Sequence, residues 1–339
     1  MCVSLVTGGA GFMGSHVVEY LLKAGHRVVV LDDLSGGFVD NVPQAADFVE
    51  GSVLDYKLLH HLFEKYNFTY VYHLAAYAAE GLSHFIKRFN YQNNLIGSVN
   101  LINESVNQDV KCFVFTSSIA VYGAGQTPLT EDMIPMPEDS YGIAKLAVEQ
   151  ELKVSHEMFG LEYVIFRPHN VYGEKQNIGD RYRNVVGIFM NQLLKGEPMT
   201  IFGDGNQQRA FTHINDVAPI IANSVTLPAA RNEVFNVGAD FPYTVNDLAQ
   251  CVAHAMGKEC RMKYLDPRNE VKVAFSDHGK AERVFGAGKR VALSDGIKAM
   301  AEWVKQHGAR ESSVFENIEI VKNMPRSWAV TIQDVTVPS

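Results

Sequence analysis

The sequence predicts an α/β fold, in which a doubly wound parallel sheet is followed by a second, smaller α/β domain. Three observations predict it: short apolar segments alternate with helical patterns in the first half, a glycine-rich turn follows the first segment, and the alternation weakens after about residue 175. Short buried strands that alternate with helices form parallel sheets covered on both faces. The right-handed crossover rule then favours a doubly wound order.

The individual elements follow from the spacing of apolar residues. Six short apolar segments are expected as strands: Val3–Val6, Val28–Leu31, Phe48–Val49, Tyr70–His73, Phe113–Phe115 and Tyr163–Phe166. Helical spacing predicts helices over 12–24, 55–66, 83–107 and 141–159, then 183–196, 246–256 and 294–307. Gly25 is suited to end the first helix. Residues 312–339 have few core-like features, and the pattern assigns them no role.

Composition excludes several classes of function. The net charge of -8 and the pI of about 5.8 leave no basic face for nucleic acid. No apolar run approaches the roughly 20 residues that a membrane-spanning helix needs. The chain shows no signal peptide, and its four cysteines form no CxxC pair, which predicts no metal site and a reducing, cytoplasmic location.

A glycine-rich turn joins the first predicted strand to the first helix. It runs from Thr7 to Gly14 and holds Gly8, Gly11 and Gly14. Glycines at this place allow a tight turn and close approach to a pyrophosphate, which the helix N-terminus attracts. Chance matches to such a pattern are mostly plain turns, but the strand before it and the helix after it favour a dinucleotide-binding Rossmann domain.

An acidic residue ends the second predicted strand. Asp32 follows the glycine turn at about the 20-residue interval expected for the acid that binds an adenosine ribose. A carboxylate there accepts hydrogen bonds from ribose hydroxyls and repels a 2′-phosphate. The sequence therefore predicts NAD rather than NADP as the cofactor; the plain alternative is a solvated strand end.

A tyrosine and a lysine share one face of the helix predicted over 141–159. Tyr141 and Lys145 stand at i and i+4. A nearby ammonium favours the phenolate, so this pair suits proton removal from a hydroxyl. The spacing alone is common on solvated helices. However, Thr116, Ser117 and Ser118 follow a predicted strand, and hydroxyls at that sheet edge lie where doubly wound folds bind ligands. For Ser117, strand-end capping is an equal alternative.

These features together resemble the extended short-chain dehydrogenase/reductase family. More closely, they are similar to its NAD-dependent nucleotide-sugar epimerases and dehydratases, and among these to the UDP-hexose 4-epimerases. The resemblance extends over about residues 3–285. Further matching motifs are His73–Ala76, Asn93-Asn94 with Gly97, Val121–Gly123, Arg167–Gly173 and Ile201–Gly205 followed by Arg209.

The resemblance implies a set of site residues. The implied catalytic residues are Tyr141, Lys145 and Ser118. The implied cofactor-binding residues are Gly8, Gly11, Phe12, Met13, Gly14, Asp32, Asp33, Ser52, Val53, Leu74, Ala75, Ala76, Asn94, Thr116, Tyr141, Lys145 and Pro168. The implied substrate-binding residues are Ser118, Asn170, Asn184, Phe202, Arg209 and Arg268. Asn184 is also suited to cap a helix, and either arginine to form a surface ion pair.

Departures from the family pattern refine the expected reaction. Ser52 stands where relatives often bind the adenine with Asp, which weakens that contact. Ile119 and Ala120 replace the Asp-Glu of dehydratases, so they cannot supply the acid for loss of water. The small Ala274 leaves room for an N-acetyl group. Glu80 lies near the expected sugar site and disfavours an acidic sugar, unless it is a plain loop residue.

The resemblance thus predicts 4-epimerisation of a nucleotide sugar through a transient 4-keto sugar. UDP-glucose and UDP-galactose are the expected pair, with their N-acetylated counterparts as candidates. Two alternatives stay open: a UDP-glucuronate 4-epimerase or decarboxylase, and a dinucleotide-sensing protein without activity. We expect NAD binding in 1–175, to which segments near 210–240 return, and nucleotide-sugar binding in 176–311. A homodimer through the helices at about 90–107 and 141–159 is implied by the resemblance.

Overall fold

A seven-stranded, wholly parallel sheet organises the first part of the chain. The computed structural model describes residues 2–124, 127–267, 273–288, 290–311, 315–325 and 328. The strand order is β11-β6-β5-β4-β1-β2-β3: β2 and β3 are added on one side of β1, and the chain then crosses over to add β4, β5 and β6 on the other. The strands are β1 (Val3–Thr7), β2 (Arg27–Asp32), β3 (Asp47–Glu50), β4 (Tyr70–His73), β5 (Cys112–Thr116), β6 (Tyr163–Pro168) and β11 (Glu233–Val237).

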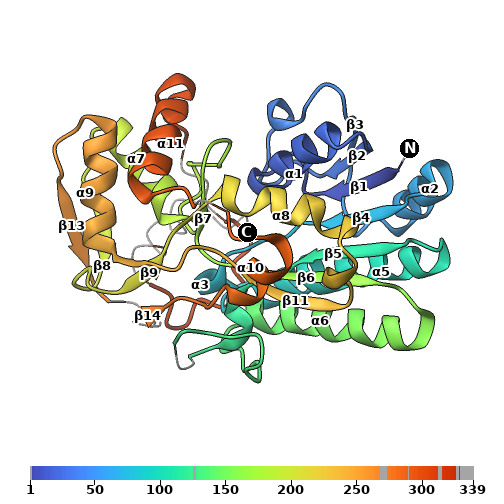
Figure 1. The fold of residues 1–339 in the computed structure, drawn as a ribbon. Helices are drawn as coiled ribbons and strands as arrows, with labels where there is room; N and C mark the ends of the chain where they lie inside the picture. The colour runs from blue at the N-terminus through green and yellow to red at the C-terminus, as the bar shows by residue number, and fades with distance from the viewer. Residues whose placement is uncertain are drawn as a thin grey trace, which may run out of the picture.

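Helices cover both faces of this sheet, as Figure 1 shows. On one face, α1 (Phe12–Lys23) and α8 (Ala218–Asn223) pack together, and their apolar residues join one core cluster. On the other face, α2 (Tyr56–Tyr66), α5 (Gly97–Asn107) and α6 (Ser140–Phe159) bury a second cluster. The predicted doubly wound α/β class is confirmed, and the six expected strands are all present. β11 adds a seventh strand that the sequence pattern did not single out.

The helix expected over 83–107 is confirmed from Lys87 to Asn107, but it starts later than expected and is not α-helical throughout. The short helix α3 (Glu80–Ser83) lies before it, and the helix itself runs without a gap through α4 (Lys87–Tyr91), a π-helical segment (Gln92–Ile96) and α5. Asn94 in the π-helical segment is buried, and its side chain bonds the backbone of Tyr77 at both N–H and C=O. Apolar spacing gives no sign of this tertiary contact or of the π-helical segment.

A second layer of helices lies to the left in Figure 1. There α7 (Val185–Leu194), α9 (Val245–Met256) and α11 (Leu293–His307) bury a core of their own. Short strands flank them: β8 (Met199–Phe202) with β13 (Met262–Leu265), β9 (Gln208–Ala210) with β12 (Pro242–Thr244) and β14 (Val273–Ala274), and β7 (Val171–Tyr172) with β10 (Thr212–His213). The remaining elements are α10 (Gly279–Phe285) and the 3-10 turns 39–41, 119–122, 214–216, 224–226 and 228–230.

No helix in the described part of the chain has the length and apolar character to cross a membrane. Among the same residues, no group of three or more His, Cys, Asp or Glu is placed to hold a metal ion. All four cysteines are unpaired.

A buried ion pair fastens α6 to the sheet. The Glu149 carboxylate on α6 accepts from Arg167 Nε at 2.9 Å and from Arg167 Nη2 at 2.5 Å. It also accepts from Ser117 Oγ at 2.6 Å. Both charged side chains are almost fully buried. Because water cannot replace a lost partner there, each charge depends on the other.

Replacing Arg167 by Leu is expected to lower the free energy of unfolding by about 3–5 kcal/mol, because the Glu149 carboxylate would stay buried without its counter-charge. Urea unfolding measures this loss. Arg27→Leu is the matched control, since Arg27 pairs with Asp47 at the surface and should cost about 0–1 kcal/mol. Equal losses in the two variants would contradict the role given to the buried pair.

Candidate functional site

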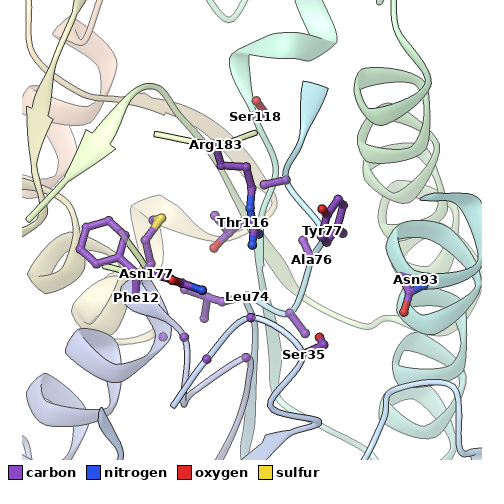
Figure 2. Close-up of a pocket in the computed structure, with 18 of the residues that line it drawn as sticks. Phe12, Ser35, Leu74, Ala76, Tyr77, Asn93, Thr116, Ser118, Asn177 and Arg183 are labelled. Carbon is purple, nitrogen blue, oxygen red and sulfur yellow. The ribbon is translucent and has the colours of Figure 1, made fainter. Parts of the chain in front are cut away.

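A cavity of about 440 Å³ opens at the carboxyl ends of the central strands. This is the edge at which doubly wound sheets bind ligands. Figure 2 shows Leu74, Ala76, Thr116 and Ser118 around it, with Arg183 facing them from the second layer. The predicted site residues that line the cavity are Gly8, Gly11, Phe12, Met13, Gly14, Asp32, Asp33, Val53, Leu74, Ala75, Ala76, Thr116, Ser118, Tyr141, Lys145, Pro168, Asn170 and Asn184.

The glycine turn is packed so tightly that larger residues do not fit. Gly8 has a φ of +71°, and a Cβ on it would lie 2.7 Å from the backbone nitrogen of Ala75. A Cβ on Gly14 would lie 2.0 Å from the carbonyl oxygen of Gly8. No side chain caps α1, whose first residues line the cavity. The helix N-terminus therefore faces the cavity, as an anionic diphosphate requires.

Asp32 ends β2 at the cavity and also holds the turn. Its Oδ2 accepts from the N–H of Ala10 at 3.0 Å, and its Oδ1 from the N–H of Leu34 at 2.9 Å. Burial raises the pKa of this carboxyl, and the backbone hydrogen bonds oppose that shift. A carboxylate has about four acceptor positions. Two protein bonds thus leave it able to accept from ribose hydroxyls.

Ser118, Tyr141 and Lys145 meet at one wall of the cavity. α6 begins beside it because Asp139 Oδ1 accepts from the N–H of Gly142 at 2.8 Å. The Ser118 hydroxyl lies close enough to the phenol of Tyr141 to lower its pKa. Lys145 Nζ donates to the carbonyl oxygen of Thr116 at 2.8 Å and lies 5.8 Å from the centre of the Tyr141 ring. The wall therefore places a phenol, a hydroxyl and an amine around one point.

Burial dominates the electrostatics of this wall. It raises the pKa of the Tyr141 phenol well above its ordinary value, although the Ser118 hydroxyl opposes the shift. It also lowers the pKa of Lys145 to about 7, against the attraction of Glu149. The protein alone thus keeps the phenol neutral. The expectation that the Lys145 ammonium and a bound nicotinamide cation together favour the phenolate stays a prediction, because desolvation is the largest influence on the phenol in the structure.

Several predicted residues are placed away from the cavity wall. Ser52, Asn94, Phe202 and Arg209 are not among the described residues that line it. Ser52 Oγ accepts from the N–H of Leu54, and Asn94 positions the backbone of Tyr77 while its neighbour Asn93 lines the cavity. Arg209 lies in β9, where it pairs with Ala274 of β14; Ala274 does not line the cavity either. Arg268 lies outside the described residues.

Asn184 occupies the N-cap position of α7 without acting as a cap. It has a φ of 62° and makes no side-chain bond to the helix. Its side chain is thus not used for the capping role that the sequence left open, and it lines the cavity. Asn170 has a φ of 42° and donates to the carbonyl oxygen of Ala210 at 3.1 Å. Both residues lie at the end of the cavity formed by the second layer.

Gln176 and Arg183 are cavity residues that had no signal in the sequence pattern. Gln176 is 1 % exposed, and neither polar atom of its amide has a hydrogen-bond partner among the described residues. The hydroxyl of Thr116, which the sequence assigned to the cofactor, is buried in the same way. Such groups are costly unless a ligand or water satisfies them. Arg183 lies 4.8 Å above the Tyr77 ring and pairs with Asp180 at 2.5 Å. These roles arise from long-range contacts, which local spacing does not encode.

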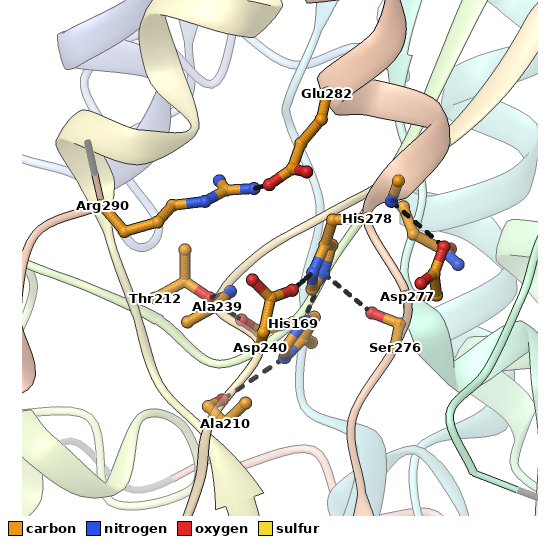
Figure 3. A network of polar contacts seen from close by, with 12 residues as sticks. His169, Ala210, Thr212, Ala239, Asp240, Ser276, Asp277, His278, Glu282 and Arg290 are labelled. Carbon is orange, nitrogen blue, oxygen red and sulfur yellow. Dashed lines mark hydrogen bonds and ion pairs between the residues drawn. The ribbon is translucent and has the colours of Figure 1, made fainter. Parts of the chain in front are cut away.

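A chain of polar contacts supports the wall from behind, as Figure 3 shows. His169 lines the cavity, and its Nε2 lies 3.1 Å from Nε2 of His278. His278 Nδ1 lies 2.5 Å from a carboxylate oxygen of Asp240. Burial and the neighbouring His278 lower the pKa of His169 to about 3, so its ring is neutral. The network ties the segment after β6 to residues 240 and 276–278.

Replacing Lys145 by Met should stabilise the protein more at about pH 6 than at about pH 9. The folded pKa of about 7 lies below the unfolded value of about 10.4. The burial penalty is therefore complete below pH 7 and is relieved as pH rises from there towards the unfolded value. Urea unfolding at both pH values measures it. Lys305→Met on exposed α11 is the control; a pH-independent difference for Lys145→Met would disprove the expectation.

The comparisons with known proteins agree with this geometry. Residues 4–238 match the model of the NAD dependent epimerase/dehydratase family. The chain is 35 % identical over 309 residues to a putative UDP-glucose 4-epimerase of Methanocaldococcus jannaschii, with 89 % of this chain and 98 % of that protein covered.

Solved structures show the same likeness. UDP-glucose 4-epimerase of Thermotoga maritima with UDP-glucose has a TM-score of 0.85 at 36 % identity, covering 90 % of this chain and 99 % of that one. UDP-glucuronic acid 4-epimerase of Bacillus cereus, in complex with UDP-glucuronic acid and NAD, has a TM-score of 0.82 at 30 % identity over 90 % of this chain and 99 % of that one. The resemblance drawn from the motifs is confirmed: the chain belongs to the NAD dependent epimerase/dehydratase family.

Proposed function

We propose that the protein catalyses the NAD-dependent 4-epimerisation of a UDP sugar, with UDP-glucose and UDP-galactose as the first candidates. One observation carries the proposal: Ser118, Tyr141 and Lys145 line the same cavity as the glycine turn and Asp32. A proton-removing wall and a dinucleotide-binding edge are thus within reach of one substrate. The relatives named UDP-glucose 4-epimerases support the choice of reaction.

The residues of the cavity fit NAD. The tight glycine turn and the N-terminus of α1 would hold its diphosphate, and Asp32 would hold a ribose. The unsatisfied hydroxyl of Thr116 offers a further polar contact inside the same cavity. When bound, the cofactor supplies reversible uptake of a hydride. The roles of Asp33, Val53, Leu74, Ala75, Ala76 and Pro168 along its path remain part of this proposal.

Tyr141 acts as the base that removes the proton of the sugar 4-hydroxyl. Its buried phenol needs positive charge close by, because burial raises its pKa. The Lys145 ammonium and the charge of an oxidised nicotinamide ring would act together to lower it. The Ser118 hydroxyl, which lowers the pKa of the phenol, would orient it and share the proton path. The resulting 4-keto sugar turns before the hydride returns to its other face.

The UDP part is assigned to the end of the cavity in the second layer. Asn170 and Asn184 line it, and the amide of the buried Gln176 is free to bond a ligand. We keep Phe202, Arg209 and Arg268 as proposed contacts that would require the second layer to approach the ligand. The N-acetylated sugars stay candidates, but Ala274 lends them no support because it does not line the described cavity.

The uronate alternative has one observation in its favour. Arg183 lines the cavity and is a group that binds carboxylates. However, Asp180 already pairs with it, and Glu80 lines the cavity as well. The carboxylate of an acidic sugar would compete with Asp180 for Arg183 and would be repelled by Glu80, so a neutral sugar is favoured. Ile119 and Ala120 are apolar and do not line the cavity, so these two positions supply no acid for dehydration.

We also propose a homodimer formed through α5 and α6. Apolar side chains of α6 and of the π-helical segment before α5 are exposed: Ile96, Ile143, Val154, Met158 and Phe159. Exposed apolar residues favour association, and sedimentation velocity measures whether the protein is a dimer. The unpaired cysteines support a cytoplasmic location.

Tyr141→Phe is expected to lower the turnover of UDP-galactose to UDP-glucose by about 10²–10⁴-fold, because the variant keeps the ring but lacks the proton acceptor. The measurement separates the C4 epimers of UDP-glucose, UDP-N-acetylglucosamine and UDP-glucuronate after incubation with pure protein. Bound NAD, released by denaturation and quantified, should remain unchanged.

Tyr243→Phe is the matched control, since Tyr243 lies in β12 and does not line the cavity; it should keep wild-type turnover. Near-normal turnover of Tyr141→Phe would show that another group is the base. A wild-type protein without NAD and without any epimer formed would overturn the proposed function as a whole.

A further inference from the structure

The segment 315–328, of which residues 315–325 and 328 are described, packs against the catalytic end of the cavity. We call these described residues the C-terminal strap. They lie outside the part matched by the family model, which ends at residue 238. The match to the Thermotoga maritima structure covers 99 % of that chain but 90 % of this one. The strap thus follows the part of the chain from which the family was recognised.

One side of the strap is bonded to the segment that joins α3 to α4. The N–H groups of Glu319 and Ile320 donate to the carbonyl oxygen of Phe85 at 2.8 and 3.1 Å. The Glu319 carboxylate accepts from the N–H groups of Arg88 and Phe89 at 2.8 and 2.9 Å. No residue next to α4 provides a side-chain cap. The strap therefore provides the hydrogen-bond acceptor for the free N–H groups at the N-terminus of α4.

The other side of the strap reaches the second layer. The N–H of Phe315 donates to the hydroxyl of Tyr182 at 3.4 Å. The Trp328 ring is 6 % exposed and lies edge-on to Tyr182, with the ring centres 5.3 Å apart. The same indole is 6.1 Å from the ring of Phe85. Trp328 therefore touches both sides of the cleft at once.

Phe315 forms a second bridge of the same kind. Its ring centre lies 5.4 Å from that of Tyr77 and 4.9 Å from that of Phe89. Together with the Tyr182 bond, it spans the two sides as Trp328 does. The apolar residues of this contact form one cluster: Tyr77, Ala79, Leu82, Phe85, Ile86, Phe89, Tyr182, Phe315, Ile318, Met324 and Trp328.

The residues held by the strap are part of the cavity wall. Tyr77, Phe89 and Tyr182 line the cavity. Arg183, next to Tyr182, lies over the Tyr77 ring, so the two sides also meet across the cavity. Both Glu80 and Arg183 act electrostatically on the Tyr141 phenol. The wall that the strap supports is therefore the one around the reacting part of the substrate.

We propose that the C-terminal strap clamps these two walls together and so determines how tightly the sugar part of the substrate is held. This inference rests on the proposed function, because it assigns the sugar to the Tyr141 end. Phe315 and Trp328 act as positioning residues, since they touch wall residues and line no part of the cavity. A ligand without a sugar, such as UDP, should bind equally well with and without the clamp.

The test compares two ligands in the full-length protein. In the double variant Phe315→Ala/Trp328→Ala, the Kd of UDP-glucose, measured by calorimetry, should rise roughly tenfold, equivalent to about 1.4 kcal/mol. The Kd of UDP alone and the content of bound NAD should change by less than about twofold. Val321→Ala is the control within the strap, since Val321 is 67 % exposed, and it should leave both affinities unchanged.

Amide hydrogen exchange provides a readout that does not depend on activity. In Glu319→Ala, the N–H groups of Arg88 and Phe89 lose their acceptor and should exchange faster, whereas those within β5 should not change. Unchanged exchange would show that the strap does not hold α4 and would overturn the clamp. Faster exchange with an unaltered Kd for UDP-glucose in the double variant would overturn it too. A wild-type protein that binds no UDP sugar would instead refute the proposed function and, with it, the clamp.

Discussion

The buried carboxylate of Glu149 is the contact on which the catalytic geometry depends. It lies on the same helix as Tyr141 and Lys145, and it bonds the ends of two strands at once through Ser117 and Arg167. Ser117 adjoins Ser118, and Arg167 adjoins the segment that carries Pro168 and Asn170. One acceptor thus fixes α6 relative to both strand ends. Such a charge is costly to bury, but in this position it determines which side chains meet.

Burial of Tyr141 and Lys145 in the cavity wall also disfavours the charged forms of their side chains. Lys145 is 2 % exposed and donates to a backbone carbonyl, and Tyr141 beside it is 7 % exposed. Burial shifts both groups towards their neutral forms. In the mechanism proposed above, proton removal would therefore need additional positive charge in the cavity. The strength of the base would then depend on the bound oxidised cofactor.

The features that could be predicted from the sequence are those determined by residues close to one another in the chain. The glycine turn, Asp32 and the Tyr141–Lys145 spacing depend on neighbours within a strand-turn-helix unit or one helical turn, so their pattern is visible in the chain. Gln176 and Arg183 became recognisable as cavity residues only through contacts between distant segments. The π-helical segment around Asn94 was likewise not predicted, because the partner of Asn94, Tyr77, belongs to a loop distant in the sequence. Glu319 capping a helix more than two hundred residues earlier is the extreme case.

The contacts of His169 and His278 limit where the hydrogens of their rings lie. The carbonyl oxygen of Ala210 can only accept, so Nδ1 of His169, 3.3 Å away, carries the hydrogen and Nε2 of that neutral ring is a lone pair. Because that Nε2 can only accept, it needs a donor, and its polar neighbour is Nε2 of His278, which also lies 3.0 Å from Ser276 Oγ. The other ring nitrogen of His278 lies against Asp240. Residues 240 and 276–278 are thus held to the segment after β6 by a row of side chains, each of which shares its hydrogens with the next.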